Sequence, residues 1–276
     1  MDRHVVGDPR KDAAQKVKHQ DPGKLREGYN PKVRALELGS ILTYGSLMLW
    51  LLARVLPHVR QNPWLLLAAV LCGYLAADFV SGYVHWLGDT WGSLKTPLLG
   101  NAMIRPFREH HVDQKAITRH DFIETNGNNC LISIPVGVMC VSMPVGPGEH
   151  QAFWLFLASF LGSMIFWVMA TNQFHKWAHT DSPPPVVSWL QRLHLILPPE
   201  HHAIHHAAPY SKYYCITVGW LNWPLHKIKF FPTLEKLTTA YLGWLPRQDD
   251  IGEEAAVAAA PELPSEPVRS HELVRP

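Results

Sequence analysis

Histidine is concentrated in the central part of this chain, in motifs whose spacing suits metal binding. The chain has 17 histidines, and most of them lie between His85 and His206. Imidazole nitrogens are ligands for iron, zinc and copper, and two ligands three or four residues apart lie on one face of a helix. We therefore predict that these histidines form a metal site.

The motifs supply at least nine candidate ligands, several of them paired or spaced by one helical turn. They are His85-x-x-x-Asp89, His110-His111, His120, His175-x-x-x-His179, His194, and the segment His201 to His206 with its His202-x-x-His205-His206 box. One zinc ion needs three or four ligands, so this number favours two ions, and it is sufficient for two irons. Haem is a poor fit, because the central parts of the apolar segments contain no histidine.

A pair of irons supplied with electrons could activate dioxygen and remove hydrogen from an unactivated C–H bond. Acid–base side chains alone cannot do this, because an alkyl C–H bond has no accessible pKa. The metal would supply the chemistry, and the protein would supply position, hydrogen-bonded support for the ligands and a dry cavity.

Four apolar runs are expected to carry these motifs. A membrane span needs about 20 apolar residues, and we predict spans at residues 38–56, 64–84, 129–145 and 152–171. The third run is the weakest candidate, because it is short and contains Pro135 and Pro144. The fold expected from this pattern is an all-α integral membrane four-helix bundle.

The loop charges predict the orientation of these spans. Lysine and arginine are frequent before the first run, between the second and third, and after the fourth, but absent from residues 146–151. The positive-inside rule then places both termini and both large loops in the cytoplasm. The second and fourth runs would end at that face, each in a histidine motif, so we expect a cytoplasmic, histidine-rich cap that holds two metals.

The remaining segments define the domain boundaries. We expect a polar N-terminal tail at residues 1–36, a membrane domain at 37–247 and a disordered C-terminal tail at 248–276, which is rich in Ala, Pro and Glu. The net charge of +2 comes without a basic stripe, so no nucleic-acid partner is expected. The four cysteines show no CxxC pairing, and we expect all four to be buried and unpaired.

Long motifs in this sequence resemble the Kua/CarF family. The resemblance spans roughly residues 38 to 240. It rests on the segments 78–92, 104–111, 117–127, 171–180, 196–206 and 214–222, which include Ile104-Arg-Pro-Phe-Arg-Glu-His-His111 and Thr171-Asn-Gln-x-His-Lys-Trp-x-His-Thr180.

That resemblance implies a plasmanylethanolamine desaturase, an oxidoreductase that forms the C1–C2 vinyl-ether double bond of plasmalogens from 1-O-alkyl ether phospholipids. It implies two iron ions, dioxygen as co-substrate and an external electron donor of the cytochrome b or ferredoxin type. It also links bacterial members to light-induced carotenoid synthesis. A bacterial inner membrane and an endoplasmic reticulum are both compatible with it.

The same resemblance assigns roles to individual residues. The metal ligands that it implies are His85, His110, His111, His175, His179, His202, His205 and His206. His120, His194 and His201 are nearby candidates for catalytic roles. Asp89 stands where many membrane desaturases carry a second histidine. It therefore either ligates a metal or holds His85 in position without binding the metal itself. Arg105 and Arg108 could bind a lipid phosphate, or could be interfacial anchors.

Other functions fit parts of the pattern. A lipid hydroxylase could use the same ligands, and an acyl-lipid desaturase would differ in its substrate. A zinc hydrolase would need one metal and a dedicated base, but no HExxH motif is present. A non-catalytic membrane regulator has no evident need for so many ligand-type residues.

Overall fold

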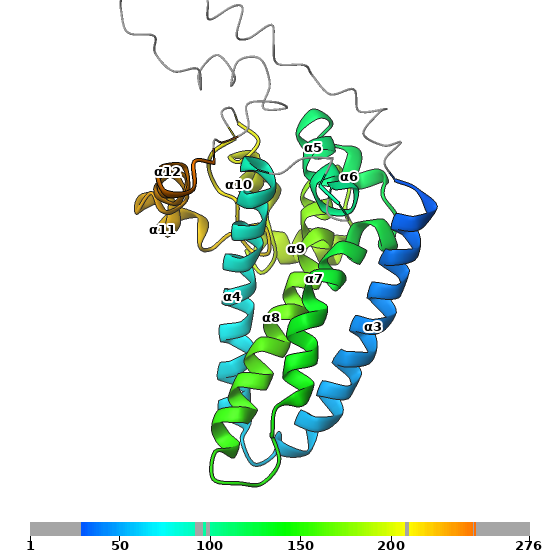
Figure 1. Cartoon of the computed structure of the whole chain (residues 1–276), viewed down its shortest axis with the longest axis vertical. Helices are drawn as coiled ribbons and strands as arrows, with labels where there is room; N and C mark the ends of the chain where they lie inside the picture. Colours follow the sequence, from blue (N-terminus) through cyan, green and yellow to red (C-terminus); the bar gives the residue numbers. More distant parts are fainter. Residues whose placement is uncertain (1–28, 92–95, 98–99, 208–209, 245, 247–276) are drawn as a thin grey trace, which may run out of the picture.

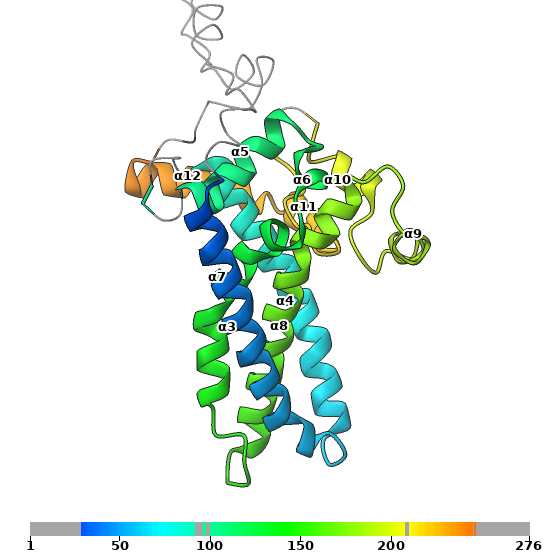
Figure 2. The same ribbon diagram turned by 90° about the vertical axis from the view of Figure 1, so that its right-hand side faces the viewer.

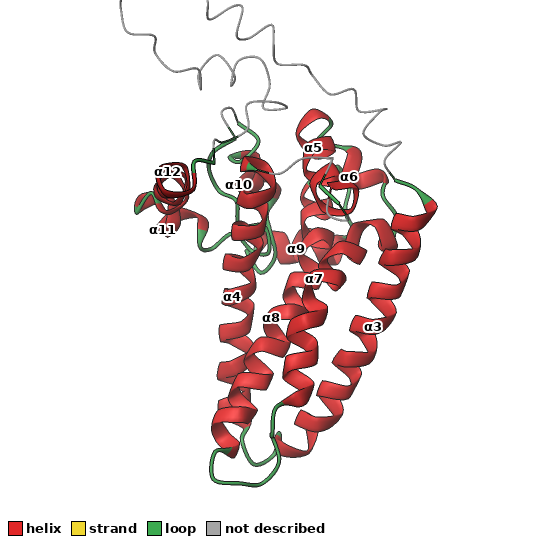
Figure 3. Cartoon of the chain, in the orientation of Figure 1, coloured by secondary structure: helices red, strands yellow, loops and turns green. Residues whose placement is uncertain are grey.

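The computed structural model describes residues 29–91, 96–97, 100–207, 210–244 and 246, and this part of the chain is helical without strands (Figure 3). Residues 1–28 of the predicted N-terminal tail (1–36) and the whole predicted C-terminal tail (248–276) lie outside the described residues, and α3 already begins at Pro31 within the predicted N-terminal tail. The helices are α3 (Pro31–Val55), α4 (Pro63–Thr90), α5 (Arg105–Val112), α6 (Ala116–Arg119), α7 (Phe122–Ser142), α8 (Gln151–Ala178), α9 (Pro185–Arg192), α10 (Pro199–Ala203), α11 (Asn222–Lys227) and α12 (Phe230–Leu242), with short turns η1 (Leu56–His58) and η2 (Gly100–Ile104).

Four long helices, α3, α4, α7 and α8, run alongside one another (Figures 1 and 2). Helix α8 packs on both α4 and α7, and α3 packs mainly on α7. The short helices gather at one end of these four, where α4 and α8 finish and α7 begins (Figure 1).

Local signals in the sequence explain where these helices begin. Asn30 caps α3 by accepting hydrogen bonds from the backbone N–H groups of Lys32 and Val33. Asp121 caps α7 in the same way, through the N–H groups of Ile123 and Glu124. Side chains that accept these otherwise unpaired donors typically stabilise a helix by about 1 kcal/mol.

Helices α3 (continued through His58), α4 and α8 are long and apolar enough to cross a membrane. Large apolar side chains on their outer faces are exposed, with Leu42 at 70% and Leu49 at 71% of full exposure. Lipid would cover such side chains, which indicates a membrane protein. Helix α7 is not among these three, so the span that we predicted at 129–145 remains a prediction.

The observed helices extend beyond the predicted apolar runs at the histidine end. Helix α4 continues to Thr90 and α8 to Ala178, so the motifs that follow the apolar runs are still helical. The prediction that all four cysteines are buried was wrong for Cys72, which is exposed on α4, whereas the other three are buried and unpaired.

Candidate metal centre

Five histidines from three helices and the turn after α10 converge on one point. They are His110, His175, His179, His202 and His206, and each offers one ring nitrogen within 4.8 Å of the others. The Nε2 atom of His175 lies 3.0 Å from Nε2 of His110 and 2.8 Å from Nε2 of His202. His206 Nε2 completes the group at 2.8 Å from His110 and 3.0 Å from His202.

These spacings match the coordination shell of a metal ion. Two nitrogens bound at right angles, each about 2.1 Å from one ion, are about 3.0 Å apart. Burial lowers the pKa of His110 and His202 well below the ordinary value, and it lowers the pKa of His179 to about 4. Neutral rings keep a lone pair, so this group of donors fits a cation.

A second group lies beside the first and consists of His85, Asp89, His111 and His205, all four of them buried. One carboxylate oxygen, Oδ2 of Asp89, lies 3.3 Å from His85 Nε2, 3.3 Å from His111 Nε2 and 3.4 Å from His205 Nε2. The first group is uncharged when its rings are neutral, whereas the second carries one negative charge that a cation would balance.

The protein backbone orients two rings of the second group. His85 Nδ1 lies 3.0 Å from the carbonyl oxygen of Tyr214, and His205 Nδ1 lies 2.9 Å from that of Lys212. A carbonyl oxygen can only accept, so each Nδ1 must carry the proton and donate it. That fixes the tautomer and leaves the Nε2 lone pair directed at the group, as is usual for histidines that bind metals.

Two of the sequence motifs are divided between the two groups. His110 belongs to the first group and its neighbour His111 to the second, because successive side chains on helix α5 point about 100° apart. The His202–His206 segment is divided in the same way, since His205 belongs to the second group. The two groups are therefore adjacent, and the His205 and His206 ring centroids are 5.2 Å apart.

A buried carboxylate in α4 anchors the loop that supports His85. Asp78 accepts hydrogen bonds from the backbone N–H groups of Val218 (2.9 Å), Gly219 (2.8 Å) and Leu221 (3.0 Å). Tyr214, the partner of His85, lies in the same loop. Asn222 closes this loop by bonding both backbone polar groups of Cys215.

We expect Asp78→Ala to lower the free energy of unfolding by about 3 kcal/mol or more, because it leaves three buried N–H groups without their charged acceptor. Thermal unfolding of the purified protein in detergent measures this loss. The matched control is Asp181→Ala, since the Asp181 side chain is 88% exposed and its removal should have little effect. Equal melting temperatures for the two variants would contradict the anchoring role.

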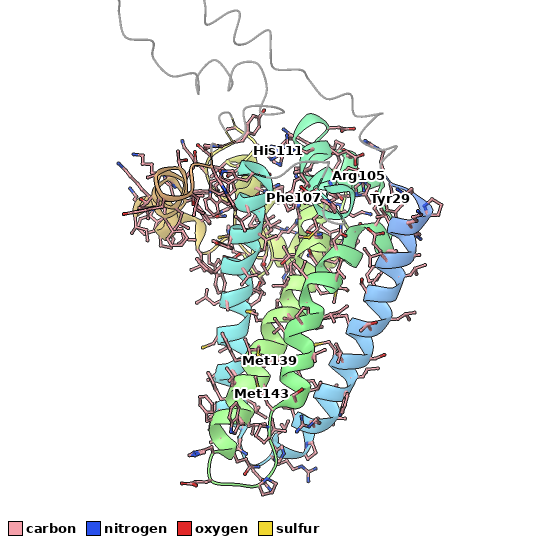
Figure 4. All side chains as sticks on the ribbon, viewed as in Figure 1. Tyr29, Arg105, Phe107, His111, Met139 and Met143 are labelled. Atoms are coloured by element: carbon pink, nitrogen blue, oxygen red, sulfur yellow. The ribbon has the colours of Figure 1, made fainter. Side chains whose placement is uncertain are left out.

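Gly88 allows α4 to approach Phe107 on α5 closely. A Cβ atom at residue 88 would lie 2.6 Å from Cδ2 of the Phe107 ring, which no real contact permits. The Phe107 ring lies beside His85, with 5.5 Å between centroids. Figure 4 shows Phe107 at the same end of the long helices as His111 and Arg105.

We therefore expect Gly88→Ala to displace Phe107 and α5 and to reduce activity by up to about 100-fold, because a misplacement of about 1 Å can cost that much. Product formation by membranes that contain equal amounts of each variant checks this. The double variant with Phe107→Leu should recover part of the loss, because the smaller side chain relieves the contact. Full activity of Gly88→Ala alone would show that the close approach is not required.

Three further histidines from the sequence analysis lie outside both groups. His120 is buried, with Nε2 3.5 Å from Glu124 and 3.9 Å from Glu109. His201 stacks on Tyr213, and His194 is exposed with its backbone carbonyl bonded to Trp220. The structure brings His194 and His201 together with the loop that Asp78 anchors, not with either ligand group.

Arg105 and Arg108, predicted to contact a lipid phosphate, are both buried. The guanidinium of Arg105 lies 2.6 Å from Glu109 and 3.2 Å from Glu124, and it stacks over Tyr29 at 5.3 Å from the ring centroid. The charge of Arg105 is therefore balanced within the protein. This arrangement is neither the phosphate contact nor the interfacial anchor that we considered from the sequence.

Two small, partly open cavities lie next to the ligand groups. The first, of about 60 Å³, is lined by His110 and His175 of the first group. The second, of about 30 Å³, is lined by His85 of the second group. Phe107 is one of four residues that line both cavities, together with Val84, Asn129 and Asn172.

The fold and the two ligand groups define a histidine-rich membrane protein that could hold metal ions. The model of the lipid desaturase domain matches residues 74–249. The chain therefore belongs to the lipid desaturase family, and it is an oxidoreductase.

Named relatives agree with this assignment. The chain is 64% identical to a plasmanylethanolamine desaturase of Myxococcus xanthus over 244 residues, which are 88% of this chain and 85% of the relative. It is 43% identical to plasmanylethanolamine desaturase 1 of Mus musculus, over 85% of this chain and 88% of the relative. It is 34% identical to the chloroplastic fatty acid desaturase 4 of Arabidopsis thaliana, over 69% of this chain and 56% of the relative. No solved structure shows a significant match.

Proposed function

We propose that this protein is a plasmanylethanolamine desaturase. It removes one hydrogen from each of C1 and C2 of the alkyl chain in a 1-O-alkyl ether phospholipid and so forms a vinyl ether. The observation that carries the proposal is the convergence of nine ligand-type side chains into two adjacent groups, in a chain 64% identical to a relative of that name.

The two groups would each hold one iron ion. His110, His175, His179, His202 and His206 would bind the first ion, and His85, Asp89, His111 and His205 the second. Iron supplied with electrons contributes dioxygen activation and C–H cleavage, which no side chain here can perform. Dioxygen and two electrons from a cytochrome b-type or ferredoxin donor, with two protons, balance the two hydrogens removed and yield two waters.

The protein's own residues prepare the site for this chemistry. Tyr214 and Lys212 orient two of the ligands through their carbonyl groups. The buried position of the second group excludes bulk water. His120 keeps a role in the proposal, because it lines the same cavity as His110 and His175. Arg108 keeps its proposed role near the lipid phosphate, whereas the ion pairs of Arg105 favour a role in orienting α5 for that residue.

We infer that α7 is a fourth span in a membrane domain of residues 37–247, and that both termini and the ligand groups face the cytoplasm. The packing of α7 on both α3 and α8 supports this, since its neighbours are membrane-capable helices. The loop charges support the orientation. A lipid headgroup could then stay in water while its chain enters between the helices.

A second candidate is desaturation of an acyl chain, which the similarity to the Arabidopsis fatty acid desaturase favours. The higher identity to the two plasmanylethanolamine desaturases favours the ether substrate. Hydroxylation of the same carbon and a role in light-induced carotenoid regulation remain predictions.

Lipid mass spectrometry tests the proposal. Cells with and without this chain are supplied with a 1-O-alkyl phosphoethanolamine lipid, in air and without oxygen. We expect an acid-labile vinyl ether only in cells that have both the chain and oxygen. A desaturated acyl lipid with no vinyl ether would favour the second candidate instead.

A further inference from the structure

Helix α9 exposes the apolar face that a helix in water would bury. Val186, Trp189 and the capping Leu193 lie on one side of it, at spacings of three and four residues, and are 62%, 53% and 49% exposed. The buried side carries Val187 and the polar residue Gln191. A helix surrounded by water turns its apolar stripe inward, so the exposed stripe of α9 indicates an apolar environment.

The turn that follows α9 is attached to the middle of a membrane-capable helix. The Tyr74 hydroxyl on α4 donates a hydrogen bond to the backbone carbonyl of Leu195. Tyr74 lies 11 residues after Pro63, where α4 begins, and 11 residues before His85. At a rise of about 1.5 Å per residue it is about 17 Å from each, and the hydrocarbon core of a bilayer is about 30 Å thick. A membrane crossed by α4 therefore reaches the depth of this turn.

The backbone of the same turn is hydrogen bonded as an apolar environment requires. The N–H of His194 donates to the carbonyl of Gln191 at 2.9 Å, and the His194 carbonyl accepts from Trp220 Nε1 at 2.9 Å. The N–H of Leu195 donates to the carbonyl of Leu190 at 2.9 Å, so both backbone polar groups of Leu195 are paired as well. Non-helical backbone is tolerated at membrane depth only where the protein satisfies its polar groups.

The inner side of α9 packs against the bundle close to the ligand groups. Val187 belongs to an apolar cluster with Phe174 and Ala178 of α8, the residues on either side of the ligand His175. Figure 2 shows α9 beside the histidine end of the long helices rather than beyond it. A bilayer around α4 and α8 would therefore contact the outer side of α9.

We propose that α9 and the turn through Leu195 lie within the membrane, in the leaflet at the histidine end, with the stripe of Val186, Trp189 and Leu193 against lipid acyl chains. The eight residues of α9 extend only about 12 Å, so this helix enters the leaflet and returns to the same side. Arg192 and His194 flank the stripe, and their polar ends can reach the headgroups.

This contact fixes the depth of the first ligand group in the membrane. Gln191 Nε2 on α9 donates to the backbone carbonyl of Leu197 at 3.2 Å, and the Leu197 N–H donates to the carbonyl of Thr217 at 3.1 Å. Helix α10, with the ligand His202, begins two residues after Leu197. The segment that delivers His202 is thus held between α9 and the loop that Asp78 anchors.

Site-specific fluorescence quenching tests the proposal. The full chain with Cys72→Ser, whose other three cysteines are buried, receives a thiol-reactive fluorophore at Trp189→Cys and is reconstituted in lipid nanodiscs. One quencher is iodide in the water, and the other is a phospholipid with a nitroxide on its acyl chain. We expect iodide to quench the label at Trp189→Cys at least about 5-fold less than a label at Glu200→Cys, because hydrocarbon excludes ions. The nitroxide lipid should give the reverse order.

Two reference positions calibrate the quenching. Glu200 is exposed on α10 and reports contact with water. Leu49→Cys reports contact with lipid, because Leu49 is exposed on the membrane-capable helix α3. If Trp189→Cys does not accumulate, Val186→Cys and Leu193→Cys report on the same face of α9.

Two results would overturn the membrane contact. Iodide quenching as strong at Trp189→Cys as at Glu200→Cys would place the stripe in water. A label shielded from both quenchers would show that protein, such as a second copy of this chain, covers the stripe instead of lipid. Neither measurement requires product formation, so loss of the proposed desaturase activity would leave the proposed position of α9 intact.

Discussion

Replacing His202 by alanine is expected to reduce vinyl-ether formation by at least about 100-fold and to lower the metal content of the purified protein. His202 Nε2 lies 2.8 Å from His175 and 3.0 Å from His206, so it belongs to the closest contacts of the first group. Loss of a group that only supports a ligand typically costs 10- to 100-fold in affinity or activity, and loss of a ligand costs more. Elemental analysis and product formation measure the two effects.

His150→Ala is the matched control for this substitution. His150 is exposed, lies at the opposite end of α8 from His175, and caps that helix without a side-chain hydrogen bond. Its removal should leave metal content and activity unchanged. A His202→Ala protein that keeps its full metal content would contradict the assignment of His202 to a metal, even if its activity were lost.

Asp89→Asn is expected to remove about half of the bound metal and to reduce activity by about 100-fold. The Oδ2 atom of Asp89 contacts the Nε2 atoms of all three histidines in the second group, and it carries that group's negative charge. An amide oxygen is neutral and a weaker ligand, so the second ion should be lost while the first group, which lacks Asp89, stays loaded.

The control for Asp89→Asn is Asp181→Asn, at an exposed carboxylate outside both groups. Its metal content should equal that of the unmodified chain. If Asp89→Asn instead retains both metals and loses only activity, Asp89 supports the histidines without binding a metal. That result would leave three histidines as the ligands of the second site.

Much of the fold could be predicted from the sequence, because it depends on local signals. Apolar runs of nearly span length, a capping Asn30 or Asp121 and prolines at first helical turns define the long helices. The direction of the second and fourth runs predicted that His85 and His175 meet at one end, and their ring centroids lie 5.9 Å apart. The start of helix α7 was the hardest helix boundary to predict. Its first turns carry polar residues, which lower the hydropathy of that segment.

The division of the candidate ligands into two groups could not be predicted from motif spacing. His110 and His111 are adjacent in sequence yet join different groups, and this depends on the rotation of α5 relative to α4 and α8. No sequence pattern indicated that the backbone carbonyls of Tyr214 and Lys212 orient two histidine rings, because every residue type has a backbone carbonyl. The anchoring role of Asp78 could have been recognised from the sequence, since a carboxylate within an apolar helix is costly unless it is paired.

The buried network around Arg105 shows another limit of sequence reasoning. An arginine near a predicted membrane face suggests contact with phosphate, but Glu109 and Glu124 take up its charge. Glu109 is one turn away on the same helix, so an i,i+4 pair could have been considered. Glu124 lies on α7, and only the three-dimensional arrangement brings it close.

The most direct test of the account uses a 1-O-alkyl lipid that carries deuterium at every hydrogen position of C1 and C2. Purified protein loaded with iron is given this lipid, dioxygen and a chemical electron source, and the product is analysed by mass spectrometry. We predict a vinyl ether that has lost one deuterium from C1 and one from C2, with no added oxygen. A product that has lost a single deuterium and gained one oxygen atom would identify a hydroxylase and contradict the account.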